Sequence, residues 1–139
     1  MRVDRSFQTD AQAEPARPEV GTASGASVVL AEALAELQEL TKRLRRDCPW
    51  DRAQTARTIV PHTVEEAYEV ADAAGSGDDE KLLDELGDLL FQVYFLALLL
   101  AEEGYGGLED VARGVHQKLE QSFSEAHLDV DVAAVVGGA

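Results

Sequence analysis

The sequence predicts an all-α protein, a bundle of four helices that pack across a homo-oligomer interface. Apolar residues recur at three- and four-residue steps through most of the chain, as they do on one face of a helix. Clusters of Gly and Pro divide this pattern into four segments. The run 89–101 is apolar on every side except at Gln92. A helical domain of this size cannot surround such a helix, so we expect a second subunit to cover part of it.

The length of the chain, 139 residues, is that of one domain. Residues 1–27 mix Pro, Gly, Ala and Ser with charges and show no period, which predicts a disordered N-terminal tail. The helical domain should occupy residues 28–126, and residues 127–139 should form a C-terminal tail.

The chain is strongly acidic, with 27 Asp and Glu against 12 Lys and Arg and a formal net charge of −15. Such a surface repels nucleic acid and anionic membranes, so we expect neither as a partner. The run 89–101 is also too short to span a bilayer. Cys48 is the single cysteine, and the N-terminus lacks the apolar segment of a secretory signal. Both observations favour a cytoplasmic location.

The first helix is expected over residues 28–46, because leucines recur there at three- and four-residue steps: Leu30, Leu34, Leu37, Leu40 (or Thr41) and Leu44. The following Cys48-Pro49-Trp50-Asp51 is expected to be a loop, because a proline disfavours the helical conformation at the residue before it. Trp50 and Asp51 in such a loop are candidates for binding the base of a ligand. The alternative is that Trp50 closes one end of the core.

The second helix is expected from His62 or Thr63 to Ala74, with a short turn before it. Thr63 is the predicted N-cap, and Glu66, three residues later, stands where the acid of a capping box lies. Four acids fall within one arc of the helix surface: Glu65, Glu66, Glu69 and Asp72. A solvated acidic face is the alternative explanation of this arc. Gly75-Ser76-Gly77 ends the helix and reverses the chain.

The third helix is expected over residues 78–103 and the fourth over 108–125, separated by a Gly-rich turn. The third begins with an apolar stripe opposite a polar arc that contains Glu85 and Asp88, and it continues as the apolar run 89–101. In the fourth, apolar residues recur at three- to four-residue steps: Leu108, Val111, Val115, Leu119 and Phe123.

The acids of the second and third helices form two pairs at a three-residue interval, Glu66 with Glu69 and Glu85 with Asp88, and Glu65 adjoins the first pair. Residues three apart share a helix face, and a tight turn makes successive helices antiparallel neighbours. Carboxylates brought together in this way repel one another unless a cation lies between them. Oxygen ligands suit Mg²⁺, Mn²⁺ or Ca²⁺. Magnesium is favoured over a di-iron site because no His follows a Glu by three residues.

Several motifs together resemble the MazG family. They are Cys48-Pro49-Trp50-Asp51, Gln54-Thr55, Pro61-His62-Thr63-Val64-Glu65-Glu66-Ala67-Tyr68-Glu69, Glu85-Leu86-Gly87-Asp88-Leu89-Leu90-Phe91-Gln92-Val93 and Lys118-Leu119. The family signature, Glu-Glu-x-x-Glu followed at a distance by Glu-x-x-Asp, is present, and the resemblance covers residues 34–119.

The resemblance implies an all-α nucleoside triphosphate pyrophosphohydrolase that works as a homodimer or higher homo-oligomer. It implies Mg²⁺ as the cofactor, with Mn²⁺ as a substitute. The implied reaction converts a nucleoside triphosphate and water to the monophosphate and diphosphate, and it would clear non-standard or excess nucleotides.

The resemblance also implies roles for individual residues. Glu66, Glu69, Glu85 and Asp88 become metal ligands by matching position. Glu65 becomes an auxiliary ligand or a base that orients the attacking water, so that Glu65, Glu66 and Glu69 form the catalytic set. Lys118 becomes a phosphate contact, and its alternative is a solvated surface lysine.

The sequence departs from the family pattern after Lys118. Where the family commonly has an Arg-rich His-Pro-His run, this chain reads Glu120-Gln121-Ser122-Phe123-Ser124-Glu125-Ala126-His127. The arginines that would neutralise phosphates are therefore missing. The alternative function is a nucleotide-binding or oligomerisation module that retains the MazG fold without hydrolysis.

Overall fold

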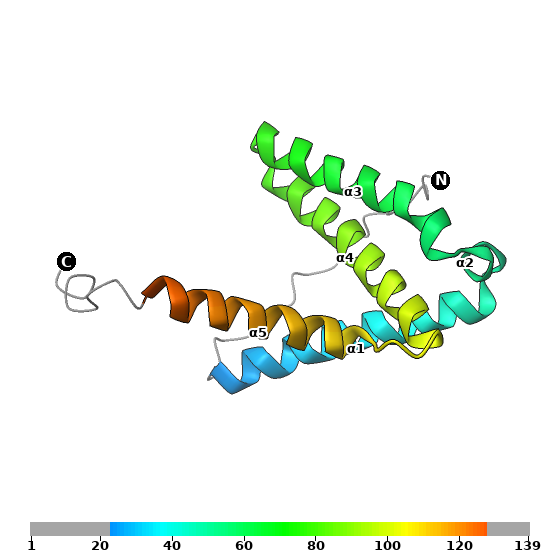
Figure 1. Cartoon of the computed structure of the whole chain (residues 1–139). Helices are drawn as coiled ribbons and strands as arrows, with labels where there is room; N and C mark the ends of the chain where they lie inside the picture. Colours follow the sequence, from blue (N-terminus) through cyan, green and yellow to red (C-terminus); the bar gives the residue numbers. More distant parts are fainter. Residues whose placement is uncertain (1–22, 128–139) are drawn as a thin grey trace. The chain divides into compact units, whose positions relative to one another are not determined.

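The computed structural model describes residues 23–127, and these residues contain helices and turns but no strand. The helices within them are α1 (Ala23–Asp47), α2 (Pro49–Ala53), α3 (Ala56–Ser76), α4 (Asp79–Glu102) and α5 (Leu108–His127) (Figure 1). The all-α prediction is confirmed for this part of the chain. The predicted count of four helices is wrong by one, because α2 was expected to be a loop.

The chain divides into two compact units between Ala35 and Glu36. Of the first unit, the structure describes residues 23–35, which form the beginning of α1. The second unit contains the rest of α1 and α2 to α5, and the site described below lies within it. The predicted tails fall outside the described residues except at their inner ends. There α1 begins at Ala23, five residues before its expected start at Val28, and α5 ends at His127, two residues beyond its expected end.

Pro49 explains why a one-turn helix stands where a loop was expected. Cys48, the residue before it, is extended, with ψ of 121°, as the steric rule requires. Pro49 itself is the first helical residue, where its missing N–H is not needed and its fixed φ suits a helix. The proline therefore begins α2 instead of preventing it.

The start of α3 was also predicted wrongly, because its N-cap is Thr55 and not Thr63. The Thr55 side chain accepts a hydrogen bond from the Thr58 N–H, and the Thr58 hydroxyl accepts one from the Thr55 N–H. This reciprocal capping box holds the first turn of α3 in place. Pro61 consequently lies inside the helix. Glu66 is left without the capping role that the sequence offered as an alternative.

A tight turn joins α3 to α4 and makes them antiparallel neighbours (Figure 1). Gly77 ends α3 with φ of 72°, a left-handed conformation that glycine adopts without steric cost. The side chain of Asp78 then caps α4 by accepting a hydrogen bond from the Lys81 N–H at 3.0 Å. The start and end of α4 each lie within one residue of the prediction.

The two antiparallel helices α3 and α4 keep a constant register. Residues closer to the turn on α3 face residues closer to the turn on α4. Farthest from the turn, Ile59 packs with Phe95 and Leu99 in the hydrophobic core. Next, the Thr63 hydroxyl donates a hydrogen bond to Gln92 Oε1 at 3.0 Å. This bond accounts for the one polar position of the apolar run, since Gln92 is buried.

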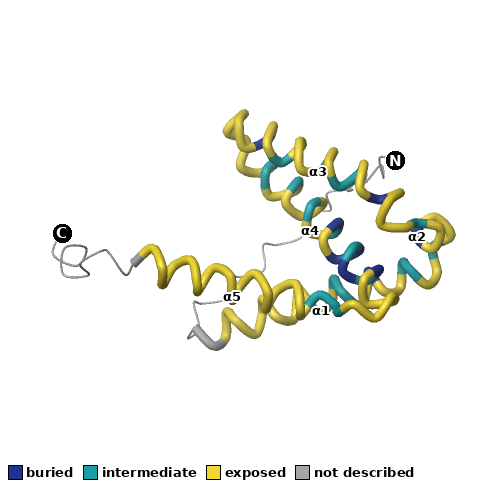
Figure 2. The backbone as a smooth tube through the Cα atoms, viewed as in Figure 1, coloured by how far each residue is buried: buried dark blue, intermediate teal, exposed yellow. Residues whose placement is uncertain are grey.

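The apolar half of α4 is only partly covered by its own chain. Five of its residues are buried: Gln92, Tyr94, Phe95, Ala97 and Leu99 (Figure 2). Leu90, Val93 and Leu100 remain 36–46% exposed. None of the helices within residues 23–127 combines the length and the apolar character needed to cross a bilayer.

Gly87 gives a test of how closely other groups approach α4. A Cβ at this position would meet no atom of the described chain within 4 Å. Gly87→Ala should therefore raise the free energy of unfolding by about 1 kcal/mol in urea titrations, because alanine is the better helix former. Gly77→Ala is the control and should lower it by about 1 kcal/mol, because alanine is strained at positive φ. A loss of stability in Gly87→Ala would show that another subunit packs against Gly87.

Candidate functional site

Three carboxylates meet on the face that α3 and α4 share. Glu66 of α3 and Glu85 and Asp88 of α4 each have an oxygen within 4.8 Å of the others. The register of the hairpin explains this meeting, because Glu66 lies one turn beyond Thr63 on α3 while Asp88 lies one turn before Gln92 on α4. The sequence therefore predicted correctly that these three acids come together.

Glu69 and Glu65 lie close enough to this acidic cluster (Glu66, Glu85 and Asp88) to interact with it electrostatically. Burial raises the pKa of Glu66 above its ordinary value, and the negative charges of neighbouring acids raise it further: Asp88, Glu85, Glu69 and Glu65. Burial likewise raises the pKa of Glu85, followed by the charges of Glu69 and Asp88. In the absence of a cation, the folded protein thus holds these carboxylates against their mutual repulsion.

The donor set fits a hard divalent cation. All three clustered side chains offer carboxylate oxygens, Glu66 and Glu85 are half-buried and Asp88 is exposed. A cation between them would reverse the electrostatic cost that raises their pKa values. The carboxylate oxygens of the cluster are therefore of the donor type that hard divalent cations prefer.

Lys81 is the basic residue beside the cluster, and the sequence analysis gave it no role. Its Nζ lies 3.3 Å from Asp72 Oδ2, and this hydrogen bond, followed by the Asp72 charge, raises the pKa of Lys81. The Lys81 charge in turn lowers the pKa of Glu85. The signal was present in the sequence, because Lys81 precedes Glu85 by one helical turn.

An aromatic pair lies between α2 and the first half of α3. The rings of Trp50 and His62 meet edge to face, with centroids 5.7 Å apart. His62 Nδ1 lies 3.7 Å from Glu65 Oε2, and Glu65 adjoins Glu66. Trp50, which is 39% exposed, is thus connected through His62 to the acids of α3. The sequence singled out Trp50 but not His62, whose spacing matched no ligand motif.

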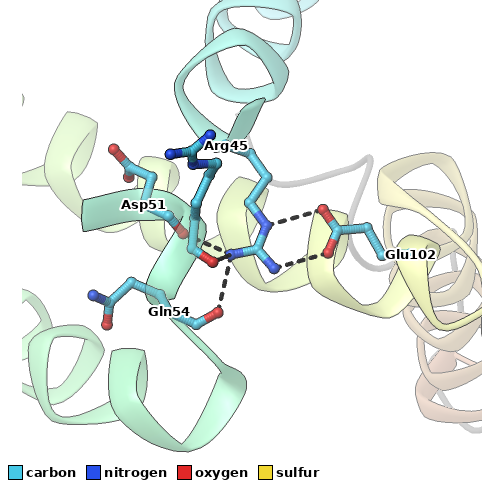
Figure 3. Close-up of polar contacts among 5 residues, drawn as sticks. Arg45, Asp51, Gln54 and Glu102 are labelled. Carbon is cyan, nitrogen blue, oxygen red and sulfur yellow. Dashed lines mark hydrogen bonds and ion pairs between the residues drawn. The ribbon is translucent and has the colours of Figure 1, made fainter. Parts of the chain in front are cut away.

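The other predicted substrate residues are less accessible or lie apart from the cluster. Asp51 is only 6% exposed, and its backbone carbonyl, not its carboxylate, makes the described hydrogen bond to Arg45 (Figure 3). Lys118 is on the exposed helix α5. In the part of the chain that the structure describes, it forms no ion pair with the acidic cluster. Its role as a phosphate contact stays a prediction.

Arg45 connects α1, α2 and α4 through its guanidinium (Figure 3). Nη1 donates to the carbonyls of Asp51, Arg52 and Gln54 at 2.6, 3.1 and 3.0 Å. Nε and Nη2 each lie 3.0 Å from an oxygen of Glu102. Sequence reasoning missed this network, because Arg45 and Glu102 are 57 residues apart.

The raised pKa values of the cluster predict a pH-dependent effect of Glu66→Gln on the metal-free protein. A carboxylate whose pKa is raised by folding destabilises the folded state when the pH is above that raised pKa. The destabilisation disappears as the pH falls to the pKa of the same group in the unfolded chain, about 4.3 for glutamate. Glu66→Gln should therefore raise the melting temperature at neutral pH, and this gain should shrink as the pH is lowered. Thermal melts with a chelator test this, with Glu36→Gln on the exposed surface of α1 as the control. A variant that melts below wild type at neutral pH would contradict the prediction.

Comparison with known proteins places this geometry in a family. Residues 54–123 match the model of the MazG nucleotide pyrophosphohydrolase domain. The nucleoside triphosphate pyrophosphohydrolase of Escherichia coli (strain K12) is 44% identical over 96 residues, which are 67% of this chain and 36% of that protein. The nucleoside triphosphate pyrophosphohydrolase/pyrophosphatase MazG of Thermotoga maritima is 40% identical over 86 residues, or 60% of this chain and 34% of that protein.

The nucleoside triphosphate pyrophosphohydrolase of Mycobacterium tuberculosis is 35% identical over 116 residues, or 76% of this chain and 36% of that protein. This chain therefore spans just over a third of the length of these relatives. The matched segment contains α3, α4 and the whole acidic cluster. The chain belongs to the MazG nucleotide pyrophosphohydrolase domain family.

Proposed function

We propose that this protein is a metal-dependent nucleoside triphosphate pyrophosphohydrolase. The observation that carries the proposal is the acidic cluster: Glu66, Glu85 and Asp88 converge from two packed helices in a chain of the MazG domain family. An acidic protein repels a polyphosphate substrate. Cations bound at the acidic cluster would reduce this repulsion and allow the substrate to bind.

Four carboxylates are assigned as metal ligands under this proposal: Glu66, Glu69, Glu85 and Asp88. A bound Mg²⁺, or Mn²⁺ in its place, would neutralise the phosphate charge and lower the pKa of the attacking water. The proximity of three of the ligand groups supports the assignment. Glu69 is included because its charge acts on both Glu66 and Glu85.

Glu65 is assigned as the base that orients the water and accepts its proton. It is the exposed neighbour of Glu66, and its Oε2 lies 3.7 Å from His62 Nδ1. In the reaction, the water oxygen bonds to the α-phosphorus, the bond from that phosphorus to the bridging oxygen breaks, and diphosphate leaves. The products are the nucleoside monophosphate and diphosphate.

The base of the nucleotide is assigned to the exposed face of Trp50, and Lys118 remains assigned to the phosphates. The exposure of Trp50 and its connection through His62 to Glu65 support the first assignment. Neither residue selects a particular base or sugar. A role in clearing non-standard or excess nucleotides and a cytoplasmic location stay predictions from the sequence.

The alternative function is a nucleotide-binding module without hydrolysis. It is favoured by the segment after Lys118, which lacks arginine, and by the absence of a described contact between Lys118 and the acidic cluster. Binding of Mg²⁺ and nucleotide without release of diphosphate would identify this alternative.

Release of diphosphate tests the proposed activity. A screen of ribo- and deoxynucleoside triphosphates with Mg²⁺ or Mn²⁺ should find turnover that a chelator abolishes. Glu69→Gln and Asp88→Asn should each reduce kcat/KM by more than about 100-fold. Loss of a residue that only hydrogen-bonds to a metal ligand already costs up to about 100-fold, and loss of the ligand itself should cost more. Asp84→Asn is the matched control, since it removes a neighbouring charge outside the cluster. Wild-type turnover in both ligand variants would refute the metal-site assignment.

A second copy of the chain is proposed to cover the apolar surface of α4 and α5. On α5, a stripe of four side chains is 41–64% exposed: Val111, Val115, Leu119 and Phe123. Leu90, Val93 and Leu100 extend the exposed apolar surface on α4. Apolar side chains exposed together on neighbouring helices can mark an interface, and they support the homo-oligomer expected from the sequence.

Light scattering at micromolar concentration should give at least twice the chain mass of 15.0 kDa. Leu119→Glu should reduce this mass, because it places a charge in the proposed interface. Gln117→Glu is the control. Residues two positions apart on a helix point in nearly opposite directions, so Gln117 lies away from the face that carries Leu119. A monodisperse wild-type monomer would refute the oligomer.

A further inference from the structure

The short helix α2 depends on its surroundings for its conformation. It contains five residues, and its N-cap, Cys48, forms no capping hydrogen bond through its side chain. A single isolated turn is not stable in water, because its nucleation is unfavourable. Some contact outside α2 must therefore fix the direction in which Trp50, its second residue, projects.

Arg45 supplies that contact at the C-terminal end of α2. Its Nη1 donates to the carbonyls of Asp51, Arg52 and Gln54, at the end of a helix where carbonyl groups commonly lack partners within the helix. The Asp51 carbonyl also accepts the Gln54 N–H at 3.2 Å. A cationic donor is also favoured at this end of a helix. One nitrogen thus holds three consecutive or nearly consecutive carbonyls in the geometry of the turn (Figure 3).

Glu102 fixes Arg45 in turn. The two side chains form a bidentate pair with both distances at 3.0 Å, which sets the plane of the guanidinium. The same guanidinium lies 5.8 Å from the centroid of Phe95, a fully buried residue of the core. The Arg45 side chain is 20% exposed. Through Arg45, the position of α2 therefore depends on the C-terminal half of α4.

Because Trp50 is part of α2, the contacts that hold the α2 backbone also fix the position of Trp50. Its carbonyl accepts a hydrogen bond from Gln54 Nε2 at 3.0 Å, and Gln54 Oε1 accepts one from the Thr58 hydroxyl at 2.9 Å. These bonds join the turn to the start of α3, where the Trp50 ring meets His62 edge to face. A shift of the α2 backbone would change that ring contact.

From these contacts we infer that Arg45, held by Glu102, is a positioning residue for nucleotide binding: it orients Trp50 against His62, beside the acids of α3. The inference rests on the proposed function for its substrate, because the base is assigned to Trp50. Arg45 itself touches none of the acids of the cluster in the described structure. It acts on the binding of the base and leaves the chemistry at the acids unchanged.

The fluorescence of Trp50 tests the positioning directly, since Trp50 is the single tryptophan of the chain. Arg45→Lys keeps the charge but cannot make the bidentate pair together with the three carbonyl contacts. Glu102→Gln is the second variant, and it leaves residue 45 as arginine but removes the carboxylate that holds its guanidinium. Both should increase the quenching of Trp50 by acrylamide in protein that thermal melts show to be folded. Arg46→Lys, one residue along α1 on the exposed surface, is the matched control and should match wild type.

Kinetics test the consequence for substrate, using the triphosphate that the diphosphate screen finds to be turned over best. Arg45→Lys should raise KM by at least about fivefold, the low end of a lost stack between a base and an aromatic ring, while kcat stays within about twofold. The decisive comparison repeats Arg45→Lys in a Trp50→Ala background. There its effect on KM should disappear, because a residue that acts only through Trp50 has nothing left to position.

Two results would overturn the inference. One is unchanged acrylamide quenching in both folded variants, which would show that Trp50 does not depend on the Arg45–Glu102 pair. The other is an effect of Arg45→Lys on KM that persists without Trp50. Failure of the proposed function is distinguishable, because no triphosphate would then be hydrolysed by wild type. In that case quenching measurements still decide whether Arg45 positions Trp50, and quenching of Trp50 by ATP with Mg²⁺ replaces KM.

Discussion

Repulsion between like charges is the constraint on which the rest of this structure depends. Glu66, Glu85 and Asp88 gain nothing from one another, and their proximity raises the pKa values of the two glutamates. Burial of Ile59, Phe95 and Leu99 between the same two helices supplies the opposing free energy. The hydrophobic core thus holds a cluster that would separate if its side chains were free, and the proposed cation would offset the repulsion between its carboxylates.

The register of the α3–α4 hairpin assigns a separate task to each of its levels. Apolar packing lies farthest from the turn, the Thr63–Gln92 hydrogen bond follows, then the acidic cluster, and the Lys81–Asp72 ion pair lies nearest the turn. The partly buried Thr63–Gln92 hydrogen bond lies between the apolar part of the helix pair and the charged part. Lys81 is paired with Asp72. The acidic cluster therefore keeps a net negative charge, because this nearby lysine is already paired with another acid.

Local patterns predicted most of the hairpin but not the elements that tertiary contacts hold in place. The boundaries of α4 follow from the Asp78 cap and a long apolar run, and the meeting of Glu66 with Glu85 and Asp88 follows from their spacing. The start of α3 was missed because Thr63 was taken as its N-cap, whereas the Thr55–Thr58 capping box begins the helix at Ala56. The helix α2 and the Arg45–Glu102 pair could not be predicted, because no periodicity connects residues so distant in sequence.

The hairpin register also has a consequence for the order in which the two ends of the site form during folding. Every contact between the acids closes a short loop around Gly77, so these contacts require little loss of chain entropy and can form outward from the turn. The Arg45–Glu102 pair closes a far longer loop, and the orientation of Trp50 depends on it. The acidic cluster should therefore be complete while the contact of Trp50 with His62 is still being assembled. Under the proposed function, newly made chains should then bind metal before they bind a nucleotide base.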